Sequence, residues 1–384
     1  MLTNNINLKN FKDKKKNNKI TNQLQILLKE NNQILNSFRN SYEDSFRKKN
    51  ISKYKKYSNL TIIGMGGSIL GAKAIYNFLK KKIKREIIFK DHLDSKQLKN
   101  KKKLNLIISK SGNTLETIAN ANILVNKNQP NIFITENKDS YLLKLAKKLK
   151  SEIIHHNNYI GGRYSVLSEV GMLPAKLMGL NVNKFRSLNN LVKNKKFINS
   201  LILNVSNTLR FINDNKLNSI ILNYDDDSLD LFKWYQQLIA ESLGKKGKGL
   251  FPIVSSMPKD NHSLMQLYLD GPKNNFYTLF FVKNDLSEKI RNEKILTSHS
   301  YLKGKKLNDI KFSQYAATIK AFNDKNIPHR CFEIINKNEE SLGELFTFFM
   351  LETILLGKAM NLNPYDQPAV ELIKKNTKKI LIKS

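Results

Sequence analysis

The chain has 384 residues, of which 40% are hydrophobic, and this length leaves room for two or three domains with substantial cores. Its 66 lysines and arginines outnumber 32 aspartates and glutamates and give a formal net charge of +34. The lysines are spread over nearly every expected helix, without arginine dominance or interleaved aromatic residues. The charge therefore indicates biased composition rather than a specific nucleic-acid site, although it could speed the capture of an anionic substrate.

The first expected elements are a polar helical lead and a short α/β unit. Residues 60–63 form a short buried strand, and the glycine-rich turn at 64–68 leads into an amphipathic helix over 69–79, with Ser68 as its N-cap. The third glycine of a dinucleotide-binding motif would fall at Ile69. The sequence therefore does not favour an NAD site.

A second turn, at residues 109–116, is rich in hydroxyl groups and follows the apolar run 104–108. Asn113 is expected to cap a helix, with Glu116 completing a capping box, so that first-turn N–H groups point into the turn. These donors and the nearby hydroxyls could hold a phosphate without a metal; the hydroxyls belong to Ser109, Ser111 and Thr114. An ordinary loop is the alternative, because such residues also form plain turns and no Walker-type lysine is in register.

A third unit has a strand at residues 131–135 and a helix opened by Ser140. Strands that alternate with helices at this spacing predict an α/β fold with a parallel, doubly wound sheet, and such sheets bind ligands at the carboxyl ends of their strands. Both special turns lie at those ends.

A second α/β unit follows a helical connection rich in lysine and asparagine. Its first strand is expected at residues 220–224, and residues 225–228 should cap a helix over 229–243 that stops at Gly244. Ser341 and Glu344 are expected to form a capping box at the start of a long apolar helix. The remaining elements are two strands and two helices, at residues 276–282, 330–335, 341–360 and from Asp366 onward.

The expected division of the chain has two α/β units with a cleft between them. The parts are a helical lead at 1–55, a first unit at 56–185, a helical connection at 186–215, a second unit at 216–365 and a C-terminal helix at 366–384.

The sequence shows neither a metal site nor a membrane segment. The single cysteine, Cys331, excludes an internal disulfide framework and indicates a reducing compartment. The six histidines lack metal-ligand spacing, and His155 and His156 would diverge on a strand. Residues 1–19 have no apolar core, and the apolar run 345–356 is too short to span a bilayer. A soluble, cytoplasmic protein is expected.

Four further positions carry weak signals when taken singly. Gln237 and Glu241 are four residues apart and share one helix face, although a carboxylate near a helix end is usually a solvated surface group. A histidine such as His262 is usually a satisfied loop residue, and Lys374 resembles any exposed lysine.

Together these positions fall into an order that resembles the phosphoglucose isomerase family, which is built from two sugar-isomerase (SIS) subdomains. The resemblance runs from Gly64 to Lys374 and rests on separated blocks in the same order. The blocks are the turns at 64–68 and 109–116, Gly-Gly-Arg-Tyr-Ser-Val-Leu-Ser at 161–168, Gln-Gln-Leu-Ile-Ala-Glu-Ser-Leu-Gly-Lys at 236–245, Asp-Asn-His-Ser at 260–263 with Asp-Gly-Pro at 270–272, and Asp-Gln-Pro-Ala-Val-Glu-Leu-Ile-Lys at 366–374.

The resemblance implies an aldose–ketose isomerase that acts on glucose 6-phosphate and fructose 6-phosphate without cofactor or metal. Glu241 would carry a proton between C2 and C1, Arg163 would stabilise the enediolate, and His262 with Lys374 would open the sugar ring. The implied substrate-binding residues are Gly67, Ser68, Ser109, Lys110, Ser111, Thr114, Gln237 and Gln367. Family members are typically homodimers, so His262 would serve the neighbouring subunit's site.

The sequence departs from the family pattern at the edges of the expected cleft. Ile373 stands where glycine commonly precedes the lysine, and residues 255–259 are a shortened, glycine-free approach to the histidine block. Two other functions stay open: a dual-specificity phosphoglucose and phosphomannose isomerase, and a non-catalytic SIS-domain sensor of sugar phosphates. The sensor would keep the phosphate turn but need neither Glu241 nor His262.

Overall fold

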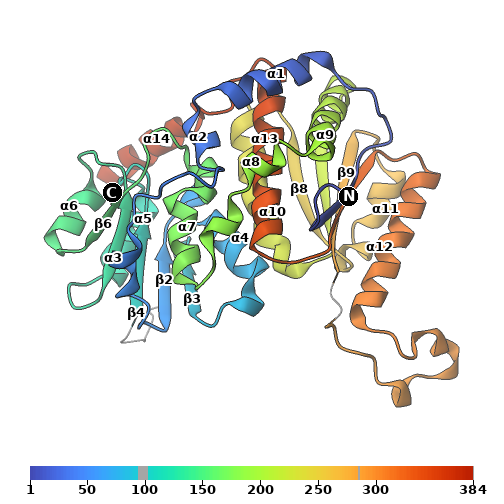
Figure 1. Ribbon diagram of the computed structural model, residues 1–384, viewed down its shortest axis with the longest axis horizontal. Coiled ribbons are helices and arrows are strands. Elements are labelled where there is room, and N and C mark those ends of the chain that lie inside the picture. Colours follow the sequence, from blue (N-terminus) through green and yellow to red (C-terminus); the bar gives the residue numbers. More distant parts are fainter. Residues whose placement is uncertain (94–102, 284–285, 384) are drawn as a thin grey trace.

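The computed structural model describes residues 1–93, 103–283 and 286–383, and its framework is two five-stranded sheets that lie side by side with helices around them (Figure 1). The first sheet has the order β3-β2-β4-β5-β6 and is parallel throughout. Its strands are β2 (Asn59–Ile63), β3 (Glu86–Lys90), β4 (Lys103–Ile108), β5 (Asn131–Thr135) and β6 (Glu152–His155).

The second sheet has the order β1-β10-β9-β7-β8. Its strands are β1 (Ile6–Lys9), β7 (Asn218–Asn223), β8 (Phe251–Ser256), β9 (Asn275–Val282) and β10 (His329–Ile334). All pairs are parallel except β1, which pairs with β10 in the antiparallel direction. The expected α/β class with parallel, doubly wound sheets is confirmed, but the lead is not purely helical, because residues 6–9 add an edge strand.

Helices of the lead and of the first half surround the first sheet. They are α1 (Asn18–Lys29), α2 (Gln33–Asn36), α3 (Lys48–Ser52), α4 (Leu70–Phe78), α5 (Leu115–Leu124), α6 (Tyr141–Lys148) and α7 (Glu169–Leu177). The expected connection is helical, with α8 (Leu188–Leu191) and α9 (Lys195–Asn213). The second half adds α10 (Leu229–Leu243), α11 (Met265–Asp270), α12 (Leu307–Asp324), α13 (Glu339–Ala359) and α14 (Val370–Lys383).

The helix α13 is buried along almost its whole length, between α9 and α10. Its neighbour α10 also packs against α4 of the first half, so one apolar cluster reaches from one sheet to the other. This packing fixes α10, and every side chain it carries, relative to the turns of the first sheet.

Several expected helix starts are wrong in detail. α5 begins at Leu115 with Thr114 as N-cap and no capping box, because the Asn113 side chain instead accepts a hydrogen bond from Tyr141 N at 3.0 Å. Ser68 does not cap α4, since it belongs to a 3₁₀ turn and the helix starts at Leu70.

Two helices of the second half also start at residues other than those expected. The capping box of α13 joins Asn338 to Ser341, while the Glu344 carboxylate accepts a hydrogen bond from the Thr3 hydroxyl at 2.7 Å. The last helix begins at Val370 rather than at Asp366. By contrast, Ser140 caps α6 as expected, and α10 has the predicted bounds.

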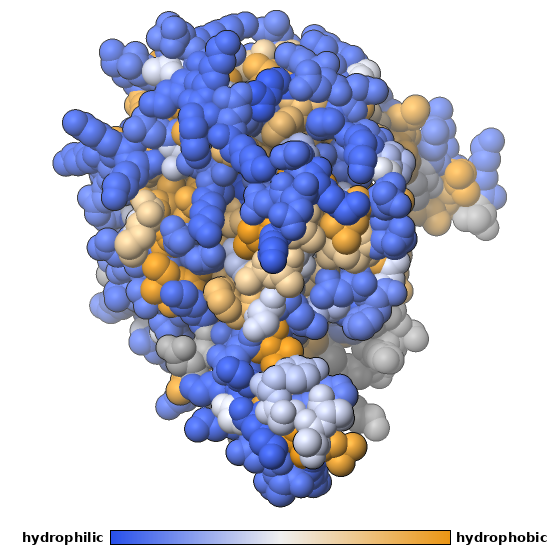
Figure 2. Space-filling view, turned by 90° about the vertical axis from the view of Figure 1, so that its right-hand side faces the viewer, coloured by the Kyte–Doolittle hydropathy of each residue, from blue (hydrophilic) through white to orange (hydrophobic). Residues whose placement is uncertain are grey.

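The face of the molecule seen in Figure 2 is mostly hydrophilic, in keeping with the lysine-rich sequence. In the described part of the chain, no helix combines the length and the apolar character needed to cross a membrane.

Candidate active site

The glycine-rich turn after β2 lies directly against the loop that carries Arg163. A Cβ atom on Gly67 would lie 2.6 Å from Arg163 N and closer still to the Gly162 carbonyl group. Gly66 has φ of +52°, a conformation that favours glycine, and a Cβ there would lie 2.8 Å from the Gln237 side chain. The missing side chains therefore let three segments approach one another: this turn, the 3₁₀ segment Gly162–Leu167 and α10.

Arg163 is 1% exposed, and hydrogen bonds hold its guanidinium group on several sides. Nε donates to Ser242 Oγ at 2.8 Å, and Nη2 donates to the carbonyl oxygens of Pro364 at 2.7 Å and Asp366 at 3.0 Å. Nη1 lies 3.3 Å from Glu241 Oε2 and also donates to the Gln367 side chain. The guanidinium is thus fixed, with one edge beside a carboxylate.

Glu241 and Gln237 lie on one face of α10, as their spacing predicts. Gln237 Nε2 donates to Glu241 Oε1 at 2.7 Å, so each carboxylate oxygen has one partner, Gln237 or Arg163. The Glu241 side chain is 28% exposed, which leaves it open to a ligand. Gln237 Oε1 is buried and has no hydrogen-bond partner among the described residues, so it can accept a bond from a ligand hydroxyl.

The hydroxyl-rich turn follows β4, at the carboxyl end of the first sheet, as expected. Ser109 is buried and its Oγ lies 2.9 Å from Thr114 Oγ1, whereas Ser111 is exposed. Gly112 has φ of +65°, and a Cβ there would clash with the side chain of Ser140. The tight turn therefore presents hydroxyls and the N-terminus of α5 on one side, which suits an anion.

Lys110 joins this turn to the loop before Arg163. Its Nζ donates to Asn158 O at 3.0 Å and lies 3.6 Å from the carboxylate of Glu136. Burial lowers the pKa of Lys110, and the nearby cations Lys138 and Arg163 lower it further, against the opposing effect of Glu136.

Two of the expected residues, His262 and Lys374, lie outside this cluster. His262 is exposed just after a 3₁₀ turn. Lys374 is exposed on α14 and forms an ion pair with Glu371 at 2.7 Å. Among the described residues, the hydrogen bonds of the Glu241 side chain run to Gln237 and Arg163 and not to His262 or Lys374.

Sequence reasoning missed the groups that immobilise Arg163. Ser242 accepts from the guanidinium and lies 2.9 Å from the Tyr164 hydroxyl, which also donates to Pro364 O at 3.1 Å. Ser242 and Tyr164 directly follow Glu241 and Arg163 in the sequence, so their positions in the same blocks were an available signal. The carbonyl groups of Pro364 and Asp366 could not be predicted in this way, because every residue type carries a backbone carbonyl group.

Comparison with known proteins now decides the family, because the model of the phosphoglucose isomerase family matches residues 12–384. The chain belongs to the phosphoglucose isomerase family. It is 33% identical over 363 residues to a glucose-6-phosphate isomerase of Methanocaldococcus jannaschii, a match that covers 87% of this chain and 88% of that protein. It is 32% identical over 364 residues to the corresponding enzyme of Mycoplasmopsis pulmonis, with 87% and 85% covered.

Solved structures share the fold of this chain. A hypothetical protein from Thermus thermophilus superposes with a TM-score of 0.83 at 24% identity and covers 95% of this chain and 94% of its own. A glucose-6-phosphate isomerase from Chlamydia trachomatis gives a TM-score of 0.72 at 19% identity, with 90% and 78% covered. The expected family and its fold are therefore confirmed.

Proposed function

We propose that the protein catalyses the reversible isomerisation of glucose 6-phosphate to fructose 6-phosphate through ring opening and a cis-enediol intermediate. The observation that carries this proposal is the convergence of Glu241, Gln237 and Arg163 beside the Gly66–Ser68 turn. Membership of the phosphoglucose isomerase family and the names of the relatives support the same reaction.

Glu241 is the proposed base. Once the ring is open, the carbonyl group at C1 of the aldose acidifies the proton on C2. Glu241 takes this proton and returns it to C1, while the hydroxyl proton of O2 passes to O1, so that one carboxylate serves both directions. Its partial exposure lets the substrate reach it, while Gln237 holds one carboxylate oxygen in place.

Arg163 supplies positive charge where negative charge develops. The enediolate oxygen forms only during proton transfer, so a fixed cation nearby stabilises the transition state more than the ground state. The bonds from Arg163 to Ser242 and to the carbonyl groups of Pro364 and Asp366 keep the guanidinium from reorienting. A guanidinium also stays protonated throughout the reaction.

The hydroxyl-rich turn is the proposed site of the 6-phosphate group. Ser109, Ser111 and Thr114 offer hydroxyls, and Lys110 adds its backbone N–H or its charge. In the same site, Gly67 and Ser68 contribute the first turn, and Gln237 and Gln367 orient sugar hydroxyls. This assignment needs no cofactor.

Ring opening is assigned to His262 and Lys374, which move protons between the ring oxygen and the C1 hydroxyl. Because His262 is exposed and makes no bond to the Glu241 cluster, the proposal includes a homodimer in which His262 serves the neighbouring subunit's site. A cytoplasmic location is part of the proposal as well, and the free Cys331 thiol supports it.

The first test measures conversion of fructose 6-phosphate to glucose 6-phosphate by the purified protein in the presence of EDTA, with Glu241→Gln as the comparison. The wild type should be active, and the variant should lose turnover by about three orders of magnitude or more with substrate binding mostly kept, because the base acts in the transition state. A folded but inactive wild type would favour the sensor instead. Unchanged turnover in the variant would remove Glu241 from the mechanism.

A further inference from the structure

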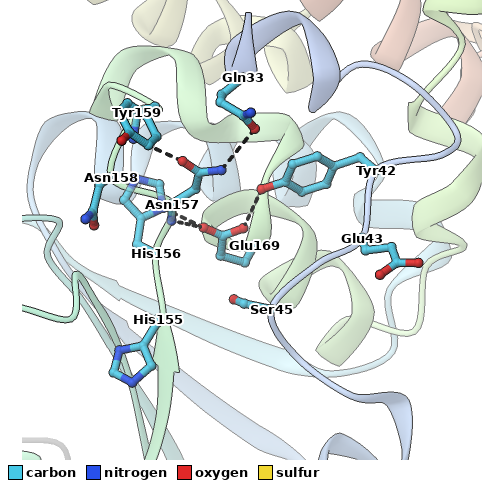
Figure 3. Close-up of a pocket in the computed structure, with 10 residues that line it drawn as sticks. All are labelled: Gln33, Tyr42, Glu43, Ser45, His155, His156, Asn157, Asn158, Tyr159 and Glu169. Carbon is cyan, nitrogen blue, oxygen red and sulfur yellow. Dashed lines mark hydrogen bonds and ion pairs between the residues drawn. The ribbon is translucent and has the colours of Figure 1, made fainter. Parts of the chain in front are cut away.

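The loop between β6 and the Gly162–Leu167 segment is held by a buried polar cluster that the proposed reaction does not use. The cluster forms one wall of a surface pocket of about 540 Å³ (Figure 3). Its central members are His156, which directly follows β6, Glu169 at the start of α7, and Tyr42 of the lead. The loop that they contact, residues 157–162, leads directly to Arg163.

Glu169 has three hydrogen-bond partners, which come from two separate segments: the residues just after β6 and the N-terminal lead. Its Oε1 accepts from Asn157 N at 2.7 Å and lies 2.7 Å from His156 Nδ1, and its Oε2 accepts from the Tyr42 hydroxyl at 3.0 Å. The side chains of Glu169 and His156 are each 1% exposed. Burial alone would raise the pKa of the Glu169 carboxyl, but His156 and the Asn157 N–H keep this pKa below its ordinary value.

His156 reaches the far end of the same loop. Its Nε2 lies 3.0 Å from Ile160 O, while Nδ1 faces Glu169. Because a carbonyl oxygen only accepts, Nε2 is the donor in the bond to Ile160 O. The imidazole thus connects the two ends of the loop: it contacts Glu169, which is bonded to Asn157 N at the start, and it contacts Ile160 O near the end.

The opposite side of the loop contacts the phosphate turn. Lys110 Nζ donates to Asn158 O at 3.0 Å, so one loop is bonded to Lys110 near its start and continues into Arg163 at its end. A shift of this loop would therefore move the proposed phosphate site and the proposed enediolate site relative to each other.

We infer that His156 and Glu169 are positioning residues that set the distance between the phosphate turn and Arg163 by holding loop 157–162 through Ile160 O and Asn157 N. Buried polar atoms are costly to leave unpaired, and the polar atoms of His156 and Glu169 find their partners in each other, in Tyr42 and in the two ends of this loop. The inference rests on the proposed function for its kinetic consequence, but the holding of the loop is independent of it.

The test separates the two bonds of the histidine ring. His156→Asn keeps a donor near the place of Nδ1 and loses the bond to Ile160, whereas His156→Gln places a donor near Nε2. His155→Gln is the matched control, since His155 is the exposed neighbour whose side chain points away from Glu169 (Figure 3). Glu169→Gln, which keeps size and one acceptor oxygen, serves as a milder second variant.

Two readouts are measured on the full-length protein. The first is hydrogen exchange of the peptide covering residues 157–163, and the second is kcat and KM for fructose 6-phosphate. We expect faster exchange and a loss of about tenfold to a hundredfold in kcat for His156→Asn, since small misplacements near a reacting centre have effects of this size. His156→Gln should recover most of both, Glu169→Gln should be intermediate, and His155→Gln should match the wild type.

Equal losses in His156→Asn and His156→Gln that track the drop in melting temperature would overturn the inference, as would unchanged exchange in all variants. Exchange decides whether the pair holds the loop even if the wild type proves inactive, and that inactivity would count against the proposed function alone. Faster exchange with unchanged kcat and KM would show that the loop position does not matter to catalysis and would overturn the positioning role.

Discussion

Lys110 differs from most of the other lysines of the chain because its ammonium group is partly buried among other charges. Its side chain is 33% exposed, and its Nζ has Asn158 O and the Glu136 carboxylate as neighbours. Burial is the largest influence and lowers its pKa below the ordinary value of 10.5.

The lowered pKa of Lys110 predicts how kcat/KM falls on the alkaline side of its pH profile. The charged form of Lys110 favours the phosphate, so kcat/KM should fall as pH rises through the pKa of the free protein, which lies below 10.5. Lys110→Arg keeps its charge at any pH of the experiment. The limb should therefore move to higher pH in this variant, whatever its activity at pH 7. Profiles of kcat/KM between pH 7 and 10.5 measure this, and superimposable limbs would contradict it.

At this scale, the sequence predicts some site residues better than others. The spacing of Gln237 and Glu241 places them on one face of α10, and the hydrogen bond between them follows from that geometry. The surroundings of Arg163 depend on carbonyl groups from residues 364 and 366, about two hundred positions away, and backbone atoms carry no sequence signal. The roles of His262 and Lys374 stay predictions.

At the scale of elements, the contact between the Gly66–Ser68 turn and the Gly162–Leu167 segment holds the site together. The two backbones approach so closely at Gly67 that no side chain fits between them. Gly161 offers a comparison in the same region, because a Cβ there would meet only Tyr164, at an ordinary 3.8 Å.

Gly67→Ala should push the turn away from Arg163. We expect a loss of at least about a hundredfold in kcat/KM together with a lower melting temperature, since backbone atoms cannot move aside without displacing the loop. Gly161→Ala should change both by little. Steady-state kinetics and thermal unfolding of the two variants make the comparison. Similar behaviour of Gly67→Ala and Gly161→Ala would show that the close approach of Gly67 to the Gly162–Leu167 segment does not matter for activity.

The elements were easiest to predict where apolar runs are continuous and turns are rich in glycine. The strands β2, β4, β5 and β7 are of this kind, because parallel strands are buried on both faces. The strands β1, β3, β6 and β8 escaped prediction since they are edge strands with polar or exposed positions. Helix caps such as Asn113 failed because a distant N–H, that of Tyr141, competes for the same side chain.

At the scale of the whole molecule, exposed apolar side chains on β8 and α14 bear on whether the protein assembles with another chain. The edge strand β8 leaves Phe251 66% exposed and Ile253 38% exposed, and no residue of α14 is buried. On α14, Leu372 and Ile373 are 65% and 71% exposed. Apolar groups gathered on an edge strand and on a terminal helix are typical of surfaces that another protein chain covers. They support the proposed homodimer and leave room for α14 and Lys374 to move on assembly.

Shared sites between two subunits would allow two inactive variants to rescue each other. Glu241→Gln lacks the base and His262→Ala lacks the ring-opening histidine, so each homodimer should be inactive. In a mixed dimer, one site would combine Glu241 of one subunit with His262 of the other, and the second site would lack both. Random 1:1 assembly gives mixed dimers half of the time, so about a quarter of the wild-type activity should return.

The measurement is isomerase activity of the two variants co-expressed, or unfolded and refolded together, with each variant treated alone as the control. Recovery near a quarter requires His262 to act across the interface, because a histidine serving its own subunit would leave every site with one defect. Absence of recovery in dimers shown to be mixed would assign His262 to its own chain. Since no hydrogen bond among the described residues joins His262 to the Glu241 side chain, such a result would further require a rearrangement of the Lys259–Asn261 turn on substrate binding.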